Sequence, residues 1–145
     1  ILSQYQNHLS QITGHSLGGS LASLAAAHIA AHKIHPANKI LLYTFGQPRT
    51  GDQRHADVHD GLKKTFRVTH HRDLVPHVPP LIMEYAHHKY EVFYPNDMAP
   101  GQTYTVCSEQ EDTRCSDQYL FETSLNDHTH YYGVEVAVFG KNGCK

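Results

Sequence analysis

The segment Gly14-His15-Ser16-Leu17-Gly18 constrains this chain more than any other part of its sequence, because it matches the pattern G-x-S-x-G. In that pattern a serine sits on a sharp turn between a strand and a helix, and the glycines on either side avoid a steric collision. A strand-like run at residues 8–13 precedes the match, and a helical pattern from 16 to about 32 follows it. We therefore predict a strand–turn–helix unit that presents Ser16 near a helix N-terminus, where the helix dipole stabilises negative charge. A glycine-rich turn with an incidental serine is the alternative.

The rest of the chain alternates short apolar runs with turn residues and helical patterns, as in βα units around a mostly parallel sheet. The helix after Ser16 is rich in alanine, which would let it pack close to a sheet, and it has an apolar stripe at 3.6-residue spacing: Leu17, Leu21, Leu24, Ala25 and Ile29. The continuous apolar run 39–45 predicts a strand covered on both faces. Other predicted elements are a short helix at 52–62, strands at 65–70 and 89–94, a loop-rich stretch at 95–127, and either a strand or a helix at 132–139.

Composition limits the possible functions. The chain has 145 residues, which fits one domain or part of one, and its 12 basic and 14 acidic residues give a net charge of −2. That balance excludes the broad basic surface of a nucleic-acid-binding protein. The longest nearly apolar stretch, 21–31, falls well short of the ~20 residues that span a bilayer, so no transmembrane segment is predicted. The chain begins with Ile1 and shows no signal-peptide pattern, so we expect a processed chain or a fragment.

A serine hydroxyl becomes a good nucleophile only when a base takes its proton and an acid orients that base. After this type of turn the order along the chain is serine, acid, histidine. Asp73 is the predicted acid, because it follows the strand 65–70 and precedes the rigid segment Leu74-Val75-Pro76. The other aspartates are weaker candidates, since they lie on the surface of the predicted helix or in loops with no strand immediately before them: Asp52, Asp57, Asp60, Asp97 and Asp127.

The choice of base is harder, because the chain contains 14 histidines. Those that follow Asp73 are His77, His87, His88, His128 and His130. His77 lies too close to Asp73 in the sequence to reach Ser16 while that carboxylate supports it. His128 and His130 lie in a polar loop before the last apolar run, where a side chain could reach over the sheet edge. The residues themselves leave both open.

Four motif blocks, in order and at compatible spacing, make the chain resemble the class 3 (filamentous-fungal-type) lipases. They are Ile12-Thr13-Gly14-His15-Ser16-Leu17-Gly18-Gly19, Thr44-Phe45-Gly46-Gln47-Pro48-Arg49-Thr50-Gly51-Asp52, Phe66-Arg67-Val68-Thr69-His70 through Asp73-Leu74-Val75-Pro76-His77, and Asp127-His128-x-x-Tyr131-Tyr132-Gly133. The histidine-rich, cysteine-bearing form resembles the nematode branch in particular. The resemblance implies an α/β-hydrolase fold, in which helices flank a mostly parallel central sheet, and hydrolysis of glycerolipid esters at an interface without a cofactor.

The same resemblance assigns roles to individual residues. Ser16 matches the family's nucleophile, Asp73 its acid, and His128, rather than His130, its base. The Leu17 backbone N–H matches one donor of the oxyanion hole. The second donor and the lid precede the nucleophile in this family, but only 15 residues precede Ser16. We therefore expect residues 1–145 to be the C-terminal part of a single catalytic domain, poorly folded and inactive when expressed alone.

The resemblance also assigns the three cysteines. In similar lipases, cysteines at the places of Cys107 and Cys115 close a small disulfide. Cys144 would pair with an upstream cysteine that this chain lacks. Disulfides persist in oxidising compartments, so a secreted protein is predicted.

Three other interpretations of the sequence are possible. A metal site is suggested by histidine pairs that are adjacent or spaced for one helix face: His28 with His32, His55 with His59, His70 with His71, and His87 with His88. Because H-E-x-x-H is absent, we expect hydrated surfaces there and no metal. The chain could also be a catalytically inactive lipid-binding relative with an incidental triad, or an esterase on non-lipid, phenolic esters.

Overall fold

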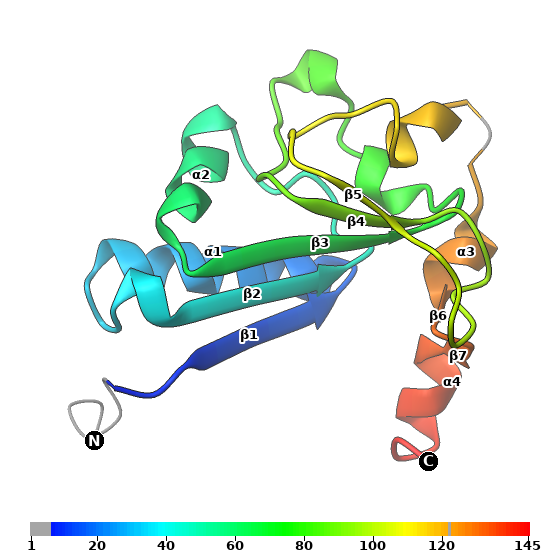
Figure 1. Ribbon diagram of the computed structural model, residues 1–145, viewed down its shortest axis with the longest axis horizontal. Helices are drawn as coiled ribbons and strands as arrows, with labels where there is room; N and C mark the ends of the chain where they lie inside the picture. The colour runs from blue at the N-terminus through cyan, green and yellow to red at the C-terminus, as the bar shows by residue number, and fades with distance from the viewer. Residues whose placement is uncertain (1–6, 122) are drawn as a thin grey trace.

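The computed structural model describes residues 7–121 and 123–145, and its main sheet is built from βα units (Figure 1). In this part of the chain the sheet has five strands in the order β1 (Ser10–His15), β2 (Ile40–Phe45), β3 (Lys64–His70), β4 (Glu91–Tyr94) and β5 (Thr105–Cys107). The first four strands are parallel, and β5 is antiparallel to β4. The predicted α/β class with a mostly parallel sheet is confirmed, and the first strand begins and ends two residues later than predicted.

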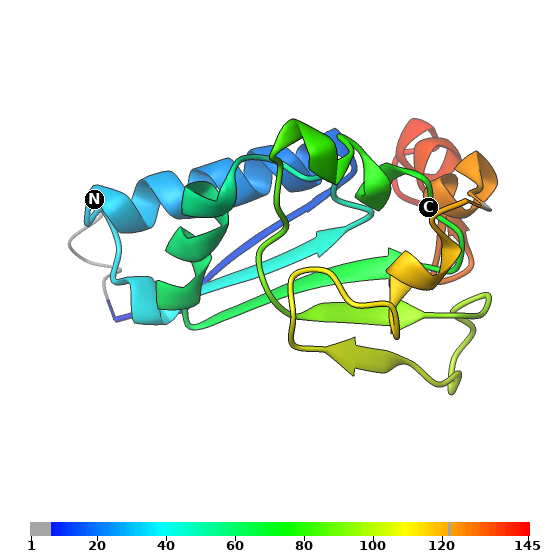
Figure 2. The ribbon, with the colours of Figure 1, turned by 90° about the horizontal axis from the view of Figure 1, so that it is seen from above.

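Helices α1 (Leu17–Ala31) and α2 (Gln53–Val58) lie on one side of the sheet (Figure 2). Near the C-terminus follow α3 (Leu125–Thr129), an antiparallel pair of β6 (His130–Tyr131) and β7 (Val134–Glu135), and α4 (Val136–Lys141). Residues 132–139 therefore contain both a strand and a helix. Short 3-10 helices are η2 (Ala37–Lys39), η3 (His59–Gly61), η4 (Val75–His77), η5 (Leu81–Met83) and η6 (Ser116–Tyr119). No helix within the described ranges is long and apolar enough to cross a bilayer.

Helix α1 packs on the sheet through its small residues and turns its leucines outward. The buried residues of the helix are Gly19, Ser20, Ala22, Ser23 and Ala26. Leu17, Leu21 and Leu24 of the predicted apolar stripe are 69%, 59% and 48% exposed. Small side chains allow the helix to approach the sheet closely, and Ala22 and Ala26 contact Ile40 and Leu42 in the core. The three leucines therefore lie on the surface, whereas Ile29 of the predicted stripe packs against the core.

Strand β2 is buried on one face only. Ile40, Leu42 and Thr44 point towards α1 and are fully buried, whereas the alternate residues 41, 43 and 45 are only partly covered. The expectation that this strand is covered on both faces is wrong for the described residues, because the helices α1 and α2 lie on the same side of the sheet. A shallow groove of about 360 Å³ marks the other face and is lined by Tyr43, Phe45, Phe66, Val68, Val92, Tyr94, Tyr104, Val106 and Tyr132.

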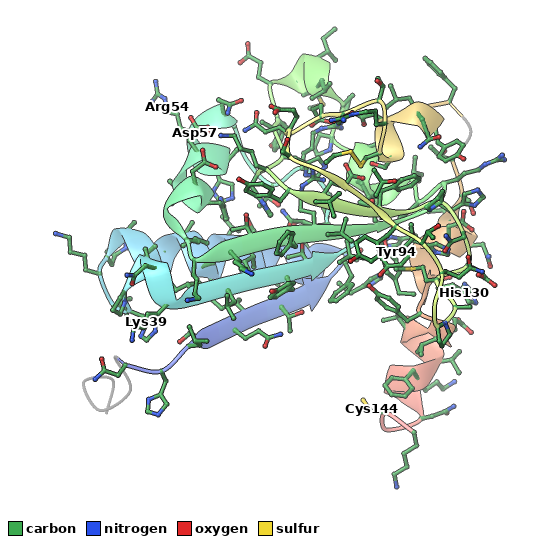
Figure 3. The ribbon with its side chains drawn as sticks, viewed as in Figure 1. Lys39, Arg54, Asp57, Tyr94, His130 and Cys144 are labelled. Atoms are coloured by element: carbon green, nitrogen blue, oxygen red, sulfur yellow. A yellow bond between two sulfur atoms is a disulfide. The ribbon has the colours of Figure 1, made fainter. Side chains whose placement is uncertain are left out.

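The cysteines divide into one bonded pair and one free thiol. Cys107 at the end of β5 forms a disulfide with Cys115, with an S–S distance of 2.07 Å. The pairing implied by the resemblance is thus confirmed. Cys144 is free and exposed beyond α4 (Figure 3). Its pairing with an upstream cysteine stays a prediction.

Candidate active site

Ser16 occupies the turn between β1 and α1. Its φ angle of 56° lies in the left-handed region, which residues other than glycine rarely adopt and which costs energy to maintain. The Ser16 N–H donates to the Phe45 carbonyl at 2.9 Å, and the Ser16 carbonyl accepts from the Gly19 N–H at 2.9 Å. These bonds hold a strained serine at the carboxyl end of a parallel strand, which is the geometry of a nucleophile elbow.

The glycines around Ser16 have different roles. A Cβ on Gly14 would lie 2.1 Å from the Gly18 carbonyl oxygen, so the close backbone approach requires glycine at that position. A Cβ on Gly18 would meet no atom within 4 Å. The expectation that both glycines avoid a collision is therefore wrong for Gly18, where the position of the carbonyl group matters rather than the absent side chain.

Ser16 is the first member of a chain of three hydrogen-bonded side chains. Its Oγ lies 2.8 Å from Nε2 of His128. Nδ1 of His128 lies 2.9 Å and 3.0 Å from the two carboxylate oxygens of Asp73. Because a carboxylate can only accept, Nδ1 of His128 carries the proton, and Nε2 is left to accept the proton of the serine hydroxyl. The structure thus brings together the three residues that the sequence singled out.

Asp73 is buried, with 1% of its surface exposed, and donors surround its carboxylate. Oδ1 accepts from the Val75 N–H at 2.8 Å, and Oδ2 accepts from the Tyr131 hydroxyl at 2.7 Å. Burial raises the pKa of the Tyr131 hydroxyl well above its usual value, and the nearby charge of Asp73 raises it further. Tyr131 therefore stays protonated and donates. Tyr131 belongs to the motif Asp127-His128-x-x-Tyr131, but the sequence did not reveal its contact with the acid.

Gly46 is a second residue that sequence reasoning missed. Its φ angle is 55°, and it follows β2 directly beside the carboxylate. A Cβ at Gly46 would lie 2.7 Å from Oδ2 of Asp73 and 3.0 Å from both Nδ1 of His128 and the Tyr131 hydroxyl oxygen. The turn after β2 must therefore lack a side chain for the acid and the imidazole to occupy their places.

Helix α3 carries His128 and is tied to the turn after β3. The Ser124 hydroxyl caps the helix by accepting from the Asp127 N–H at 3.1 Å. The Asp127 carboxylate accepts from the Arg72 N–H at 3.1 Å. His130, labelled in Figure 3, follows the helix and donates through Nδ1 to the Asn126 carbonyl at 2.8 Å. The structure thus directs His128, and not His130, to Ser16.

The Leu17 N–H is at the first position of α1, directly after Ser16. The first N–H groups of a helix have no partner within the helix, so they are available to an anion. An oxygen that gains negative charge beside Ser16 would lie within the positive end of the α1 dipole. Such a group has the chemistry of an oxyanion donor.

The remaining candidates from the sequence lie elsewhere. Asp52 caps α2, Asp57 accepts from Gln53, and Asp60 pairs with Lys89. His77 lies 3.5 Å from Asp117, between Nδ1 and Oδ1. His87 donates to the Pro76 carbonyl, and His88 donates to the Lys89 carbonyl.

The histidine pairs do not all form hydrated surfaces. His28 and His32 are exposed, as expected. His59, His87 and His88 are each 2% exposed and His70 is 7% exposed, so the expectation is wrong for these four residues. His59 is buried because its Nε2 meets the Ser23 hydroxyl at 2.9 Å and its ring stacks on His88. Within residues 7–121 and 123–145, no three potential ligand side chains are grouped to hold a metal ion.

Comparisons with known proteins place these features in context. The Lipase (class 3) family model matches residues 1–83. Lipase ZK262.3 of Caenorhabditis elegans is 36% identical over 174 residues, covering 99% of this chain and 49% of that protein. The secreted mono- and diacylglycerol lipase 1 of Fusarium solani is 42% identical over 77 residues, covering 52% of this chain and 22% of that protein.

A solved lipase structure is similar to this chain in three dimensions as well. It is a triacylglycerol lipase whose catalytic centre is formed by a serine protease triad, and it superimposes with a TM-score of 0.84 at 33% identity. The match covers 94% of this chain and 52% of that structure. The chain thus spans about half the length of these two longer matches.

Proposed function

The chain belongs to the class 3 lipase family, which has the α/β-hydrolase fold, and from that premise we propose that it supplies the catalytic triad of a serine carboxylic ester hydrolase that cleaves acyl esters of glycerolipids. One observation carries the proposal: the continuous hydrogen bonds from Ser16 Oγ through the His128 ring to the buried Asp73 carboxylate. The strained backbone of Ser16 supports it, because such strain persists at positions where function requires it.

The first half-reaction transfers the acyl group to Ser16. Its Oγ attacks the ester carbonyl carbon while His128 Nε2 takes the hydroxyl proton. Negative charge develops on the carbonyl oxygen and is stabilised by the Leu17 N–H. The intermediate collapses, the C–O bond to the alcohol breaks, and the imidazolium of His128 returns the proton to the leaving oxygen. The alcohol departs, and the acyl-enzyme remains.

The second half-reaction repeats these steps with water. Water attacks the acyl carbon and gives a proton to His128, and collapse of the intermediate returns that proton to Ser16 as the fatty acid leaves. Asp73 stays ionised throughout, holds the tautomer of His128, and stabilises its charged form. No residue of this scheme requires a cofactor.

The glycerolipid substrate is proposed from the relatives and from the surface beside the triad. The relatives' names specify triacylglycerol, or mono- and diacylglycerol. Leu17 is next to Ser16 and 69% exposed, and Leu125 is on the helix of His128 and 64% exposed. Exposed apolar side chains at the starts of α1 and α3, close to Ser16 and His128 in the sequence, favour contact with acyl chains at a lipid interface. A lipid-binding relative without activity and an esterase on phenolic esters are the alternatives.

A secreted location is also part of the proposal. The Cys107–Cys115 disulfide fits an oxidising compartment, and one relative is named a secreted lipase. The same setting would allow Cys144 to form a disulfide with an upstream cysteine.

Labelling with a fluorophosphonate probe tests the catalytic proposal on the full product of the gene, whether or not it extends beyond these 145 residues. We expect labelling that is lost in Ser16→Ala and kept in Ser108→Ala, a matched change at an exposed serine beside the disulfide. Absence of labelling in the unmodified protein would contradict catalysis and favour lipid binding. Initial rates on emulsified triacylglycerol, a soluble short-chain ester and a feruloyl ester then decide the substrate class.

A further inference from the structure

Helix α3 is too short to satisfy its own carbonyl groups. It has five residues, Leu125–Thr129, and the last carbonyl groups of any helix receive no hydrogen bond from an N–H of the same helix. Three successive carbonyls of this helix accept from histidine side chains. His130 donates to Asn126 at 2.8 Å, His70 to Asp127 at 2.9 Å, and His15 to His128 at 2.8 Å.

Two of these donors come from the rigid part of the fold. His15 is the last residue of β1, and His70 is the last residue of β3, so they flank the end of β2. A carbonyl oxygen can only accept a hydrogen bond, so Nε2 of His15 and Nδ1 of His70 must carry protons. The ends of two strands therefore hold adjacent carbonyls of the helix that carries His128.

His15 makes a further contact with His128. The two imidazole rings stack with centroids 4.7 Å apart and an angle of 28° between their planes. Burial lowers the pKa of His15, which keeps its ring neutral, so no like charge opposes the proton that His128 must accept in catalysis.

Tyr131 joins these contacts to the acid. Its ring packs edge-on against His15 at 5.4 Å and against His70 at 5.6 Å between centroids. Its hydroxyl donates to Asp73 at 2.7 Å. The two histidines, the tyrosine and the acid thus form one packed unit around His128.

We propose that His15 and His70 are positioning residues, which fix the His128 ring between Ser16 and Asp73 by holding the α3 carbonyls on the sheet edge. This inference rests on the proposed function of the triad. A short helix without these donors would lose its contacts with the ends of β1 and β3 and keep those that Asp127 makes to the turn after β3. The imidazole would then shift from its place between hydroxyl and carboxylate. A displacement of about 1 Å is enough to reduce turnover by about 10²-fold.

Pairs of variants with equal shape separate the donor from the bulk of the side chain. Glutamine places an N–H donor near the position of Nε2, and methionine has similar length without a donor, so His15→Gln is compared with His15→Met. Asparagine and leucine have the same relation to Nδ1, so His70→Asn is compared with His70→Leu. His32→Leu is the control, because His32 donates through Nδ1 to the His28 carbonyl at the far end of α1, in the same kind of contact.

The measurements are kcat and KM on a soluble ester and the low-field proton resonance of the His128 Nδ1–H bonded to Asp73. For the Met and Leu variants we expect kcat to fall about 10²-fold with KM nearly unchanged, and the resonance to shift or disappear. For the Gln and Asn variants and the control we expect kcat within about fivefold of the unmodified protein. If one apolar variant does not fold, the pair at the other strand decides.

Three results would overturn the inference: apolar variants with unchanged kcat, an unchanged resonance, or Gln and Asn variants as impaired as their apolar partners. Failure of the proposed function is recognised separately, because the unmodified protein would then show no fluorophosphonate labelling at Ser16. In that case the resonance, which needs no substrate, still tests whether His15 and His70 position His128.

Discussion

Replacement of Gly46 by alanine tests how tightly the backbone packs against the acid of the triad. The φ angle of Gly46 is 55°, and an added Cβ would lie 2.7 Å from Oδ2 of Asp73 and 3.0 Å from Nδ1 of His128. Carbon atoms in ordinary contact lie about 3.5–4.0 Å apart. The carboxylate or the end of β2 must therefore move by up to about 1 Å to accept the methyl group.

Two energetic costs add in this variant. An L-residue in the left-handed region costs about 1–2 kcal/mol, and a methyl group forced into filled space costs about 1–3 kcal/mol. We expect Gly46→Ala to lower the free energy of unfolding by about 2–5 kcal/mol, a large share of the ~5–15 kcal/mol that stabilises a typical protein. Because Asp73 and His128 are the displaced groups, kcat should fall by about 10²-fold as well.

Urea unfolding of the full product of the gene, followed by far-UV circular dichroism, measures the stability change, and its hydrolysis of a soluble ester measures kcat. Gly61→Ala is the control, because an added Cβ there meets no atom within 4 Å. Its free energy of unfolding should stay within about 1 kcal/mol of the unmodified protein. A loss below about 1 kcal/mol for Gly46→Ala, or an equal loss in both variants, would refute the reasoning.

Four further predictions follow from the contacts described. Burial lowers the pKa values of His55, His59, His87 and His88, so their neutral forms stabilise the fold above about pH 6.5 and that stability is lost as the pH falls. The urea midpoint should therefore drop between pH 7.5 and 5, less steeply in His59→Gln, and unchanged in slope in the exposed pair His28→Gln with His32→Gln. Tyr131→Phe leaves a buried carboxylate oxygen of Asp73 without its donor, which should cost about 1.5–3 kcal/mol of stability and lower kcat, while Tyr104→Phe should do neither. Cys107→Ala with Cys115→Ala should lower the free energy of unfolding by about 2–3 kcal/mol, as expected from a closed loop with a sequence separation of 8; an unchanged urea midpoint would argue against this. Residues 1–145 expressed alone should unfold without cooperativity and hydrolyse no ester, and a soluble, cooperative and active product would contradict this.

Elements with a local signal were predictable from the sequence. The turn at Ser16 requires glycine at position 14 because a side chain there would collide with the backbone, and the pattern G-x-S-x-G contains that glycine. The strands β2 and β3 follow from continuous or alternating apolar residues, and both lie within one residue of the predicted bounds. Asp73 was found because an acid directly after a parallel strand lies at the same sheet edge as the serine turn. In each case the residues that determine the element are close together in the sequence.

Orientation and coverage were not predictable, because they depend on distant residues. A 3.6-residue period shows that α1 has an apolar stripe, but not which side faces the sheet. Close packing against Ile40 and Leu42 favours Ala22 and Ala26 over leucine, so the leucines of the stripe point outward. In the same way, the apolar run of β2 does not show which of its faces is covered, and within the described residues only the face towards α1 is fully buried. The groove lined by aromatic residues on that face has no counterpart in the sequence pattern.

The base of the triad shows the limit most clearly. His128 and His130 are two residues apart in the same polar segment, and the residues around them do not favour one over the other as the base. The three-dimensional structure distinguishes them: His128 lies within α3 and its Nε2 meets the Ser16 hydroxyl, whereas Nδ1 of His130 donates to the Asn126 carbonyl. Helix α3 has only five residues, which is too short for an amphipathic period to be detected. It is held instead by a serine cap and by side chains from β1 and β3.

The abundance of histidine has a physical reason that its spacing along the chain conceals. A neutral imidazole can donate from one nitrogen and accept at the other, so it can bridge backbone carbonyls and hydroxyls in places too apolar for a charged side chain. His59 bridges the His55 carbonyl and the Ser23 hydroxyl in this way, whereas His15 and His70 each donate from one ring nitrogen to a carbonyl of α3. The i, i+4 spacing of His55 and His59 that suggests a metal site thus serves polar contacts within the core. Burial lowers the pKa values of His59 and His15, so these two rings make their contacts in the neutral form, and acid that charges them opposes those contacts.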